Sequence, residues 1–285
     1  DIAMYEAKRA GKGQIKIFDP AMRLGATTQL EYRSELGSAL ENRQLRLVFQ
    51  PLVDLRTGEV VGAEALVRWL HPTRGEISPA EFIPVAERSG LIKEIGRWVL
   101  SLALREAARW QSRGDRYVSV NVSAVQLRTE GFVDEVAEAL ELTGLAPAQV
   151  LLEVTETVLV EEIESASSSL LALRDLGVRI AIDDFGTGYC SLSYLQKFPV
   201  DVVKIDRQFV DEVDGGASRS SLAQMILQMT SSMGVTSVAE GIERPEQLAA
   251  LREFGCDVGQ GYLLSRPLEL DTVHRRFGVD LVSSP

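Results

Sequence analysis

The stretch VRIAIDDFGTG, residues 178–188, carries the features from which the fold can be worked out. Its first five residues are mostly apolar and rich in β-branched types, a composition typical of a buried strand. Two adjacent carboxylates, Asp183 and Asp184, follow, and then a loop with two glycines. Neighbouring acids at the end of a buried strand repel each other and lose hydration, so one interpretation is a compensating divalent cation. An exposed Asp-Asp turn is the other interpretation, and this stretch alone favours neither.

Length and charge limit the classes of protein to which the chain can belong. Its 285 residues are enough for one large domain with an appendage, and a hydrophobic content of 45% supplies a core. The formal net charge is −11 and there is no basic run, which argues against long nucleic acid and anionic membrane surfaces as partners. A small phosphate ester would also be repelled, unless metals reverse the charge locally.

Cysteine usage and apolar runs indicate the cellular setting. Cys190 and Cys256 have neither metal-site nor CxxC spacing, so we expect free thiols in a reducing, cytoplasmic environment. No apolar run approaches the ~20 residues of a membrane span. Because the chain begins at Asp1 without Met, we expect a fragment of a longer protein, for which an anchor in the inner membrane stays open.

From residue 45 onward, apolar runs alternate with helical segments. Strands are predicted at 45–53, 59–67, 117–122, 150–154, 178–182, 201–205, 235–239 and 256–258. Helices are predicted at 27–43, 79–111, 131–143, 161–176, 217–233 and 245–254. This alternation predicts an α/β protein with a parallel sheet, and eight strands fit a (β/α)₈ barrel, with an open doubly wound sheet as the alternative. Only Arg56-Thr57-Gly58 separates the first two strands, which predicts an antiparallel hairpin at the start of the barrel.

Polar side chains stand at or just past the end of most predicted strands. They are Glu64, Arg68, Asn121, Glu153, Asp183, Asp184, Lys204, Asp206, Glu240 and Gln260. Each alone is compatible with a solvated strand end or a cap, but barrel enzymes build their sites from several strand ends together. Carboxylate and amide oxygens select a hard cation, Mg²⁺ or Mn²⁺, and such a set can hold two ions for in-line phosphoester displacement. Since His71 and His274 lie outside the set, a zinc hydrolase is disfavoured.

The segment Glu64-Ala65-Leu66-Val67-Arg68 stands among other motifs in a fixed order. These are FQPLVDL (49–55), EFIPVAERSGLI (81–92), NVSAVQL (121–127), LLEVTET (151–157), DDFGTGYCSLSYL (183–195), VDVVKID (200–206), AEGIE (239–243) and GQGYLLSRPL (259–268). Over residues 31–277 the chain resembles the EAL family of cyclic di-GMP phosphodiesterases. The resemblance implies a modified (β/α)₈ TIM barrel with an antiparallel first strand, here residues 27–278, followed by a tail at 279–285.

The resemblance implies the roles of the site residues. Its metal ligands would be Glu64, Asn121, Glu153, Asp183, Asp184 and Glu240. Two ions of Mg²⁺ or Mn²⁺ would share Asp183, and a water between them would attack a phosphorus of cyclic di-GMP to give pGpG. Lys204 would position or polarise that water. The general base stays open, between Glu240 and the metals acting alone.

Further positions follow from the same resemblance. Substrate contacts would come from Gln50, Leu66, Arg68 and Gln260. The loop after the two aspartates would be supported by Glu156, Gly186, Thr187 and Gly188. Cys190 stands where the family usually has serine, which removes no ligand. Family members commonly dimerise through the region following this loop, so we expect a homodimer.

Residues 1–26 are a separate piece. AMYEAKRAGK (3–12) resembles the end of a GGDEF domain, the diguanylate cyclase fold, although the GGDEF signature itself is absent. We interpret 1–26 as the remnant of such a domain with a linker, and we expect an upstream GGDEF or sensor domain in the full protein. The leading hypothesis is an active phosphodiesterase. The alternatives are a catalytically silent cyclic di-GMP receptor and an unrelated barrel lyase with a lysine base.

Overall fold

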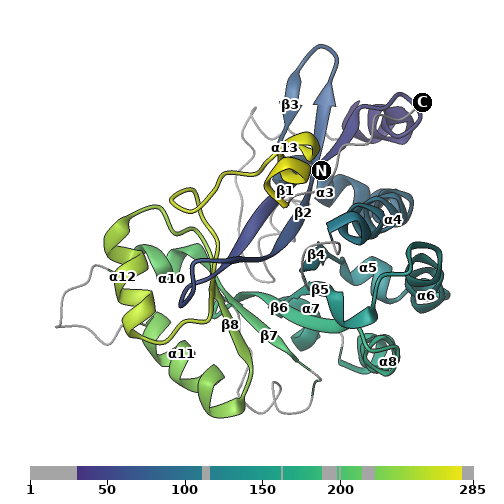
Figure 1. The fold of residues 1–285 in the computed structure, drawn as a ribbon. Coiled ribbons are helices and arrows are strands. Elements are labelled where there is room, and N and C mark those ends of the chain that lie inside the picture. Colours follow the sequence, from purple (N-terminus) through teal and green to yellow (C-terminus); the bar gives the residue numbers. More distant parts are fainter. Residues whose placement is uncertain are drawn as a thin grey trace, which may run out of the picture. The chain divides into compact units, whose positions relative to one another are not determined.

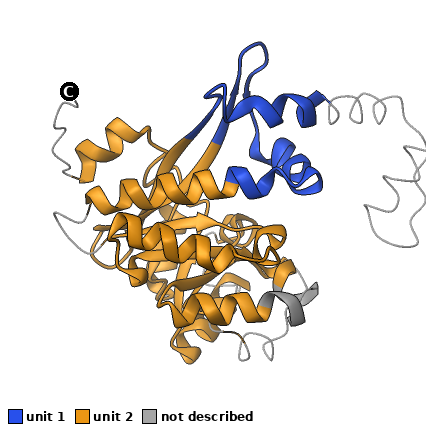
Figure 2. Ribbon diagram, turned by 90° about the vertical axis from the view of Figure 1, so that its right-hand side faces the viewer, with its two compact units in different colours: residues 1–46, 68–95 blue, residues 47–67, 96–285 orange. Residues whose placement is uncertain are grey.

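The computed structural model describes residues 31–110, 116–161, 163–187, 198, 200–213 and 222–277. They fall into two compact units, residues 1–46 with 68–95 and residues 47–67 with 96–285 (Figure 2). The predicted GGDEF remnant, the tail at 279–285, Gly188 and Cys190 lie outside the described residues, so those predictions stay untested.

A closed sheet forms the centre of the larger unit (Figure 1). Its strands are β1 (Leu45–Asp54), β2 (Val60–His71), β4 (Tyr117–Asn121), β5 (Val150–Thr155), β6 (Arg179–Phe185), β7 (Val202–Ile205), β8 (Thr236–Ala239) and β9 (Val258–Gly259). Their order is β1-β9-β8-β7-β6-β5-β4-β2, and a β1–β2 pairing closes the ring. All neighbours from β2 round to β9 are parallel, whereas β1 is antiparallel to β9. The predicted barrel with an antiparallel first strand is confirmed, and the open doubly wound sheet is wrong.

The helices of the described residues follow the strands as predicted, with some additions. They are a helix over 31–39, α3 (Pro79–Ser89), α4 (Ile92–Trp110), α5 (Ala124–Leu127), α6 (Phe132–Thr143), η2 (Pro147–Gln149), α7 (Glu156–Glu161), α8 (Ile163–Asp175), α10 (Arg207–Asp211), α11 (Leu222–Met233), α12 (Pro245–Glu253) and α13 (Leu270–Phe277). None of these helices is both long enough and apolar enough to span a lipid bilayer.

Two sequence expectations about these elements need correction. The single helix predicted over 79–111 is two helices, because Gly90 takes a left-handed conformation (φ 81°) and its N–H closes the end of α3 on the carbonyl of Glu87. The short elements α5, α10 and β3 (Gly75–Ile77) were not predicted, since segments of three to five residues carry too little periodicity to detect. α5 and α10 are instead stabilised by side-chain caps from Ser123 and Asp206.

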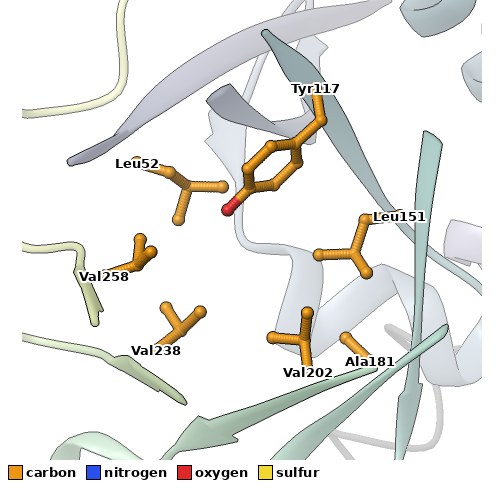
Figure 3. Packing of buried hydrophobic residues seen from close by; sticks show 7 residues of the cluster. All are labelled: Leu52, Tyr117, Leu151, Ala181, Val202, Val238 and Val258. Atoms are coloured by element: carbon orange, nitrogen blue, oxygen red, sulfur yellow. The ribbon is translucent and has the colours of Figure 1, made fainter. Parts of the chain in front are cut away.

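The interior of the barrel is filled by a layer with one side chain from each of seven strands (Figure 3). The layer contains Leu52, Tyr117, Leu151, Ala181, Val202, Val238 and Val258. Chiefly through burial, the pKa of Tyr117 rises to about 12, and the guanidinium of Arg179 lies 4.4 Å from the centre of its ring. The barrel is therefore a packed core at this level and not a pore.

Side chains alternate between the two faces of a strand, so the layer predicts what lies next to it. Two residues further toward the carboxyl ends of the parallel strands, or two residues back along the antiparallel β1, the interior face carries polar groups. These are Gln50, Ser119, Glu153, Asp183, Lys204, Glu240 and Gln260. An apolar layer thus supports a polar layer directly above it.

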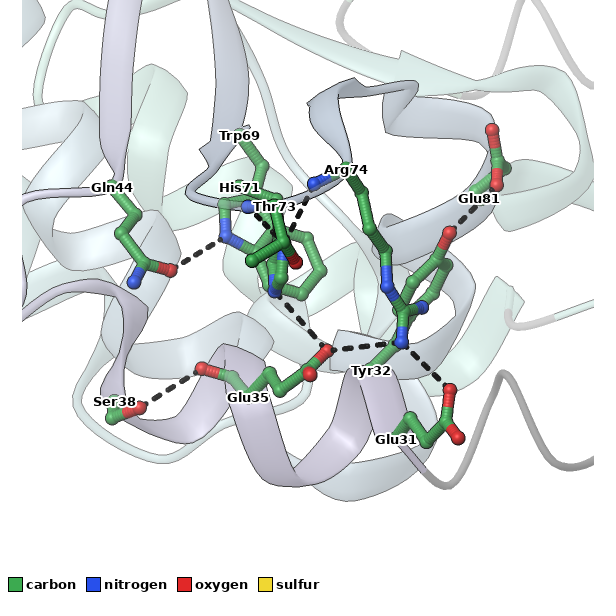
Figure 4. Close-up of polar contacts among 10 residues, drawn as sticks. All are labelled: Glu31, Tyr32, Glu35, Ser38, Gln44, Trp69, His71, Thr73, Arg74 and Glu81. Carbon is green, nitrogen blue, oxygen red and sulfur yellow. Dashed lines mark hydrogen bonds and ion pairs between the residues drawn. The ribbon is translucent and has the colours of Figure 1, made fainter.

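The smaller unit is held together by a polar network on the end of β2 (Figure 4). The Nδ1 atom of His71 accepts hydrogen bonds from the backbone N–H groups of Thr73 and Arg74, both at 3.3 Å. Its Nε2 therefore carries a proton and faces Oε2 of Glu35 at 3.3 Å. Arg74 also contacts Glu31 at 2.7 Å. Both ring nitrogens of His71 are thus engaged in packing the helix over 31–39 against the β2–β3 hairpin.

Candidate active site

Lys204 lies at the centre of the polar layer. It extends from β7, its side chain is 1% exposed, and its Nζ atom lies 2.6 Å from Oε2 of Glu153 and 2.6 Å from Oε1 of Glu240. The same Nζ is 3.1 Å from Oδ1 of Asp183 and 3.6 Å from Oε2 of Glu64. Barrel closure thus brings acids from β2, β5, β6 and the end of β8 around one ammonium group.

Neutral donors occupy further oxygens of these carboxylates. Asn121 Nδ2 donates to Oε1 of Glu64 and Gln260 Nε2 donates to Oε2 of Glu64, both at 2.7 Å. The hydroxyl of Ser119 donates to Oε1 of Glu153. Hydrogen bonds of this kind fix the orientation of a carboxylate and favour its charged form.

Asp183, Asp184 and Glu240 form a second grouping. Each offers a carboxylate oxygen, and these oxygens all lie within 4.8 Å of one another. Alternation along a regular strand would send adjacent aspartates to opposite faces, but β6 is irregular between Ile182 and Phe185, and Asp184 takes a left-handed conformation (φ 54°). Aspartate is one of the few non-glycine residues that tolerate this conformation. The irregularity therefore brings two consecutive acids to one site.

The pKa values of three acids in the cluster are raised, mainly by burial. Burial raises the pKa of Glu240 to about 8 and that of Asp184 to about 6, with the charge of Asp183 adding to both. Burial, followed by the charge of Glu64, also raises the pKa of Glu153 well above its usual range.

Two groups of the cluster are held in their charged forms. Burial alone would raise the pKa of Glu64, but Lys204 and the hydrogen bonds from Gln260 and Asn121 lower it. For Lys204, burial would lower the pKa, but the surrounding carboxylates, Glu153 first, raise it well above the usual value. Lys204 is therefore a charged donor.

The other predicted site residues have identifiable places. Gln50 and Gln260 are buried and hydrogen-bonded to each other at 3.0 Å. The carboxylate of Glu156 accepts a hydrogen bond from the N–H of Gly186 at 2.8 Å, and the hydroxyl of Thr187 donates to the carbonyl of Asp184 at 2.8 Å. Glu156 is thus attached to the start of the loop rather than to the acidic cluster.

Leu66 and Arg68 follow Glu64 along β2. Arg68 belongs to the smaller unit, where its Nε is 3.5 Å from Oε1 of Glu76. Leu66 is half-buried on β2, two residues beyond Glu64 and on the same face of the strand. Asp206, predicted among the strand-end acids, caps α10 by accepting from the N–H of Gln208 at 2.8 Å.

Sequence reasoning missed Ser119. It lies two residues before Asn121 in the segment YVSVN, on the same strand face, and is fully buried. The alternation of β4 was the available signal, because a serine on the interior face of a buried strand needs a partner.

Two other reactive residues are not part of the cluster. His274 faces Glu106, with Nε2 and Oε2 2.9 Å apart. Cys256 is a free, buried thiol whose pKa burial raises to about 12. The expectation of a free thiol is confirmed at Cys256. Neither His274 nor Cys256 is a member of the acidic cluster.

Comparison with known proteins agrees with this geometry. A family model described as the EAL domain matches residues 33–267. Uncharacterized protein y4lL of Sinorhizobium fredii is 42% identical over 270 residues, 94% of this chain and 32% of that protein. Cyclic di-GMP phosphodiesterase NbdA of Pseudomonas aeruginosa is 42% identical over 271 residues, 94% of this chain and 35% of that protein. The chain thus spans about a third of the length of these two curated relatives.

A solved structure has the same fold. The PaMucR phosphodiesterase in its c-di-GMP complex superposes with a TM-score of 0.81 at 40% identity, over 85% of this chain and 99% of that one. The match of the family model covers most of the chain and includes Glu64, Lys204 and Glu240. The chain belongs to the EAL domain family.

Proposed function

We propose that this chain hydrolyses cyclic di-GMP to linear pGpG with the aid of two divalent cations, Mg²⁺ or Mn²⁺. The observation that carries the proposal is the lysine-centred cluster, in which Nζ of Lys204 lies 2.6–3.6 Å from carboxylates of Glu153, Glu240, Asp183 and Glu64. Support also comes from two relatives, NbdA and PaMucR, that are named as phosphodiesterases of cyclic di-GMP or bound to it.

The chemistry of the cluster suits divalent cations. Acids whose pKa values are raised by burial, and further by the charges of neighbouring acids, gain most from added positive charge. Within the part of the chain that the structure describes, the buried Oδ1 of Asp183 has no hydrogen-bond partner, although Nζ of Lys204 lies 3.1 Å away. The ligands would be Glu64, Asn121, Glu153, Asp183, Asp184 and Glu240. When bound, such cations polarise a phosphoryl oxygen and lower the pKa of a water molecule.

Other roles in the proposed reaction are assigned to side chains of this protein: positioning the water, accepting its proton, contacting the substrate and supporting the loop. Lys204 stays protonated among the acids, so it donates to and positions the nucleophilic water rather than accepting its proton. The general base is proposed to be Glu240 or, alternatively, the cations acting alone by lowering the pKa of the water. Leu66, Arg68 and Gln260 are proposed to contact the substrate. Glu156, with residues 186–188, is proposed to hold the loop that begins at Asp183.

Assays of turnover test this function directly. The purified chain is mixed with cyclic di-GMP and Mg²⁺ or Mn²⁺, and pGpG is measured by chromatography. We expect Glu64→Ala and Asp183→Asn to lose activity by at least ~100-fold while melting cooperatively, because each removes a carboxylate from the proposed metal site. Asp257→Asn is the matched control, since Asp257 bonds the backbone and hydroxyl of Ser237 instead.

The same assay separates the alternatives. Binding of cyclic di-GMP without turnover in either metal would contradict hydrolysis and support a silent receptor. Neither binding nor turnover would point to another barrel activity.

We also propose the context in which the chain works. A homodimer follows from the family resemblance, and a cytoplasmic location follows from the cysteine usage. An upstream GGDEF domain is supported by the similarity to MucR of Pseudomonas aeruginosa, named a bifunctional diguanylate cyclase/cyclic di-GMP phosphodiesterase and 41% identical over 270 residues. Anchoring of the full protein to the inner membrane stays a prediction.

A further inference from the structure

The side chain of Gln50 on β1 is held at both ends of its amide. Its Nε2 donates to the carbonyl of Ser265 at 3.1 Å, and its Oε1 accepts from Nε2 of Gln260 at 3.0 Å. A backbone carbonyl can only accept, so the amide cannot be turned over without placing two oxygens against each other. Gln50 is 8% exposed, which leaves little water to replace a lost partner.

The backbone holds the carbonyl of Ser265 in place beside Gln50. Phe49, the neighbour of Gln50, exchanges two hydrogen bonds with Leu268, at 2.9 and 2.8 Å. The hydroxyl of Ser265 donates to the carbonyl of Arg266 at 2.9 Å. Leu268 is therefore bridged to β1, three residues beyond the carbonyl that accepts from Gln50, and the N–H of Ser265 is bonded to the carbonyl of Gly261 at 2.9 Å.

The orientation of Gln50 determines that of Gln260. The Nε2 group of Gln260 donates to Oε1 of Gln50 and also to Oε2 of Glu64, at 3.0 and 2.7 Å. Reversing the Gln260 amide would set its oxygen against both acceptors. In the observed orientation, Oε1 of Gln260 is buried and has no hydrogen-bond partner among the described residues. One amide group thus carries a donor to Glu64 and keeps a free acceptor.

We propose that Gln50 is a positioning residue for the metal site: acting through Gln260, it maintains the hydrogen bond that orients the carboxylate of Glu64. Both ends of the Gln50 amide are already engaged inside the protein, which argues for this role over the substrate contact that the family resemblance implies. The inference rests on the proposed function, because it takes Glu64 to be a metal ligand.

The test measures Mn²⁺ binding without substrate, from the electron paramagnetic resonance signal of free Mn²⁺. Gln50→Met keeps the size of the side chain and removes both hydrogen bonds, so we expect the Kd for Mn²⁺ to rise about 10-fold, as is usual when an outer hydrogen-bond partner of a ligand is lost. The matched control is Gln126→Met, since Gln126 is also buried but its side-chain oxygen accepts from Ser123. This control should change the Kd by less than ~2-fold.

A double-variant cycle distinguishes positioning from a general loss of stability. If Gln50 acts through Gln260, then Gln50→Met should have almost no further effect on the Kd in a Gln260→Ala background. Effects that multiply would overturn the proposal. So would an unchanged Kd accompanied by a raised KM, which is the signature of a direct substrate contact.

The remaining outcomes are also decisive. Gln50→Leu, which also removes both hydrogen bonds, replaces Gln50→Met if the latter does not fold, and it should raise the Kd as well. Wild-type protein that binds no Mn²⁺ would overturn the proposed function together with this inference. Wild-type protein that binds Mn²⁺ no better than Gln50→Met would overturn this inference alone.

Discussion

Ser119 is the residue that occupies the second oxygen of Glu153. Its hydroxyl donates to Oε1, while Lys204 contacts Oε2 at 2.6 Å. We expect Ser119→Ala to weaken Mn²⁺ binding by about 10-fold, because a hydrogen bond to a carboxylate favours its charged, ligating form. Isothermal titration with Mn²⁺ measures this change.

A second buried serine provides the control for that prediction. Ser237 on β8 is 1% exposed, and its hydroxyl donates to Asp257 at 2.8 Å, not to the acidic cluster. Ser237→Ala should cost a similar ~1–3 kcal/mol of unfolding free energy and leave the Mn²⁺ affinity within ~2-fold. Equal losses of affinity in the two variants would show that Ser119 has no specific role.

The raised pKa of Glu240 makes the stability of the metal-free protein depend on pH. Its folded value is about 8, against ~4.3 for an unfolded chain, so the fold favours the protonated form. This contribution is complete below the unfolded pKa and is lost as pH rises through the folded pKa. With a chelator present, we expect the Tm to fall between pH 5.5 and 8.5, by at least ~3 °C more in wild type than in Glu240→Gln.

Differential scanning calorimetry across this pH range checks the prediction. Added Mg²⁺ should restore more of the Tm at the upper end, because a metal binds the ionised ligand. Parallel Tm curves for wild type and Glu240→Gln would exclude Glu240 as the source of the pH dependence.

At the scale of elements, the start of α7 is joined to the end of β6. β5 and β6 are parallel neighbours, with Thr155 opposite Asp183, so Glu156 and the residues after Asp183 emerge side by side. Glu156 Oε2 then accepts from the N–H of Gly186 at 2.8 Å. Gly186 has φ 97°, and a Cβ there would lie 2.8 Å from the ring of Phe209, so only glycine fits this position.

Removing that connection should loosen the loop. We expect Glu156→Ala to accelerate amide hydrogen exchange at Gly186 by at least ~10-fold, since the protecting acceptor is lost. Glu156→Gln retains an acceptor oxygen and should remain close to wild type. Mass spectrometry of the peptides spanning β6 measures the exchange, and equal rates in all three proteins would exclude a tether at Glu156.

At the scale of the molecule, the closed sheet brings side chains from seven strands together in one apolar layer. Leu52 enters this layer from the antiparallel β1 and is 1% exposed. We expect Leu52→Ala to lower the free energy of unfolding by ~2–5 kcal/mol, through lost burial and the cavity that remains. Leu142→Ala, at a leucine that is 78% exposed, should change it by less than ~0.5 kcal/mol. Urea denaturation followed by circular dichroism compares them, and equal losses would contradict a core role for the layer.

Much of this architecture could be predicted because it depends on short-range patterns. The apolar runs placed the long strands, and the three-residue connection Arg56–Gly58 predicted the irregular start of the barrel. The break at Gly90 was missed because two helices with continuous amphipathic character look like one until the glycine conformation is known. Ser119 was missed because a serine in a strand has no partner in its own neighbourhood of the sequence.

The sequence by itself determined which strand each polar group follows and what chemistry that group can perform. Through its motifs, it also determined the family. Only the tertiary structure decided which of those groups touch. Alternation assigns Lys204 to the interior face of β7, but its position among acids from four other strand ends follows from barrel closure. The pair Asp183–Asp184 shows the same division. The two carboxylates can be read from the sequence. Their position beside the carboxylate of Glu240, however, requires the irregular end of β6 and the left-handed backbone of Asp184. Such contacts join residues far apart in the chain, and no local pattern encodes the distance between them.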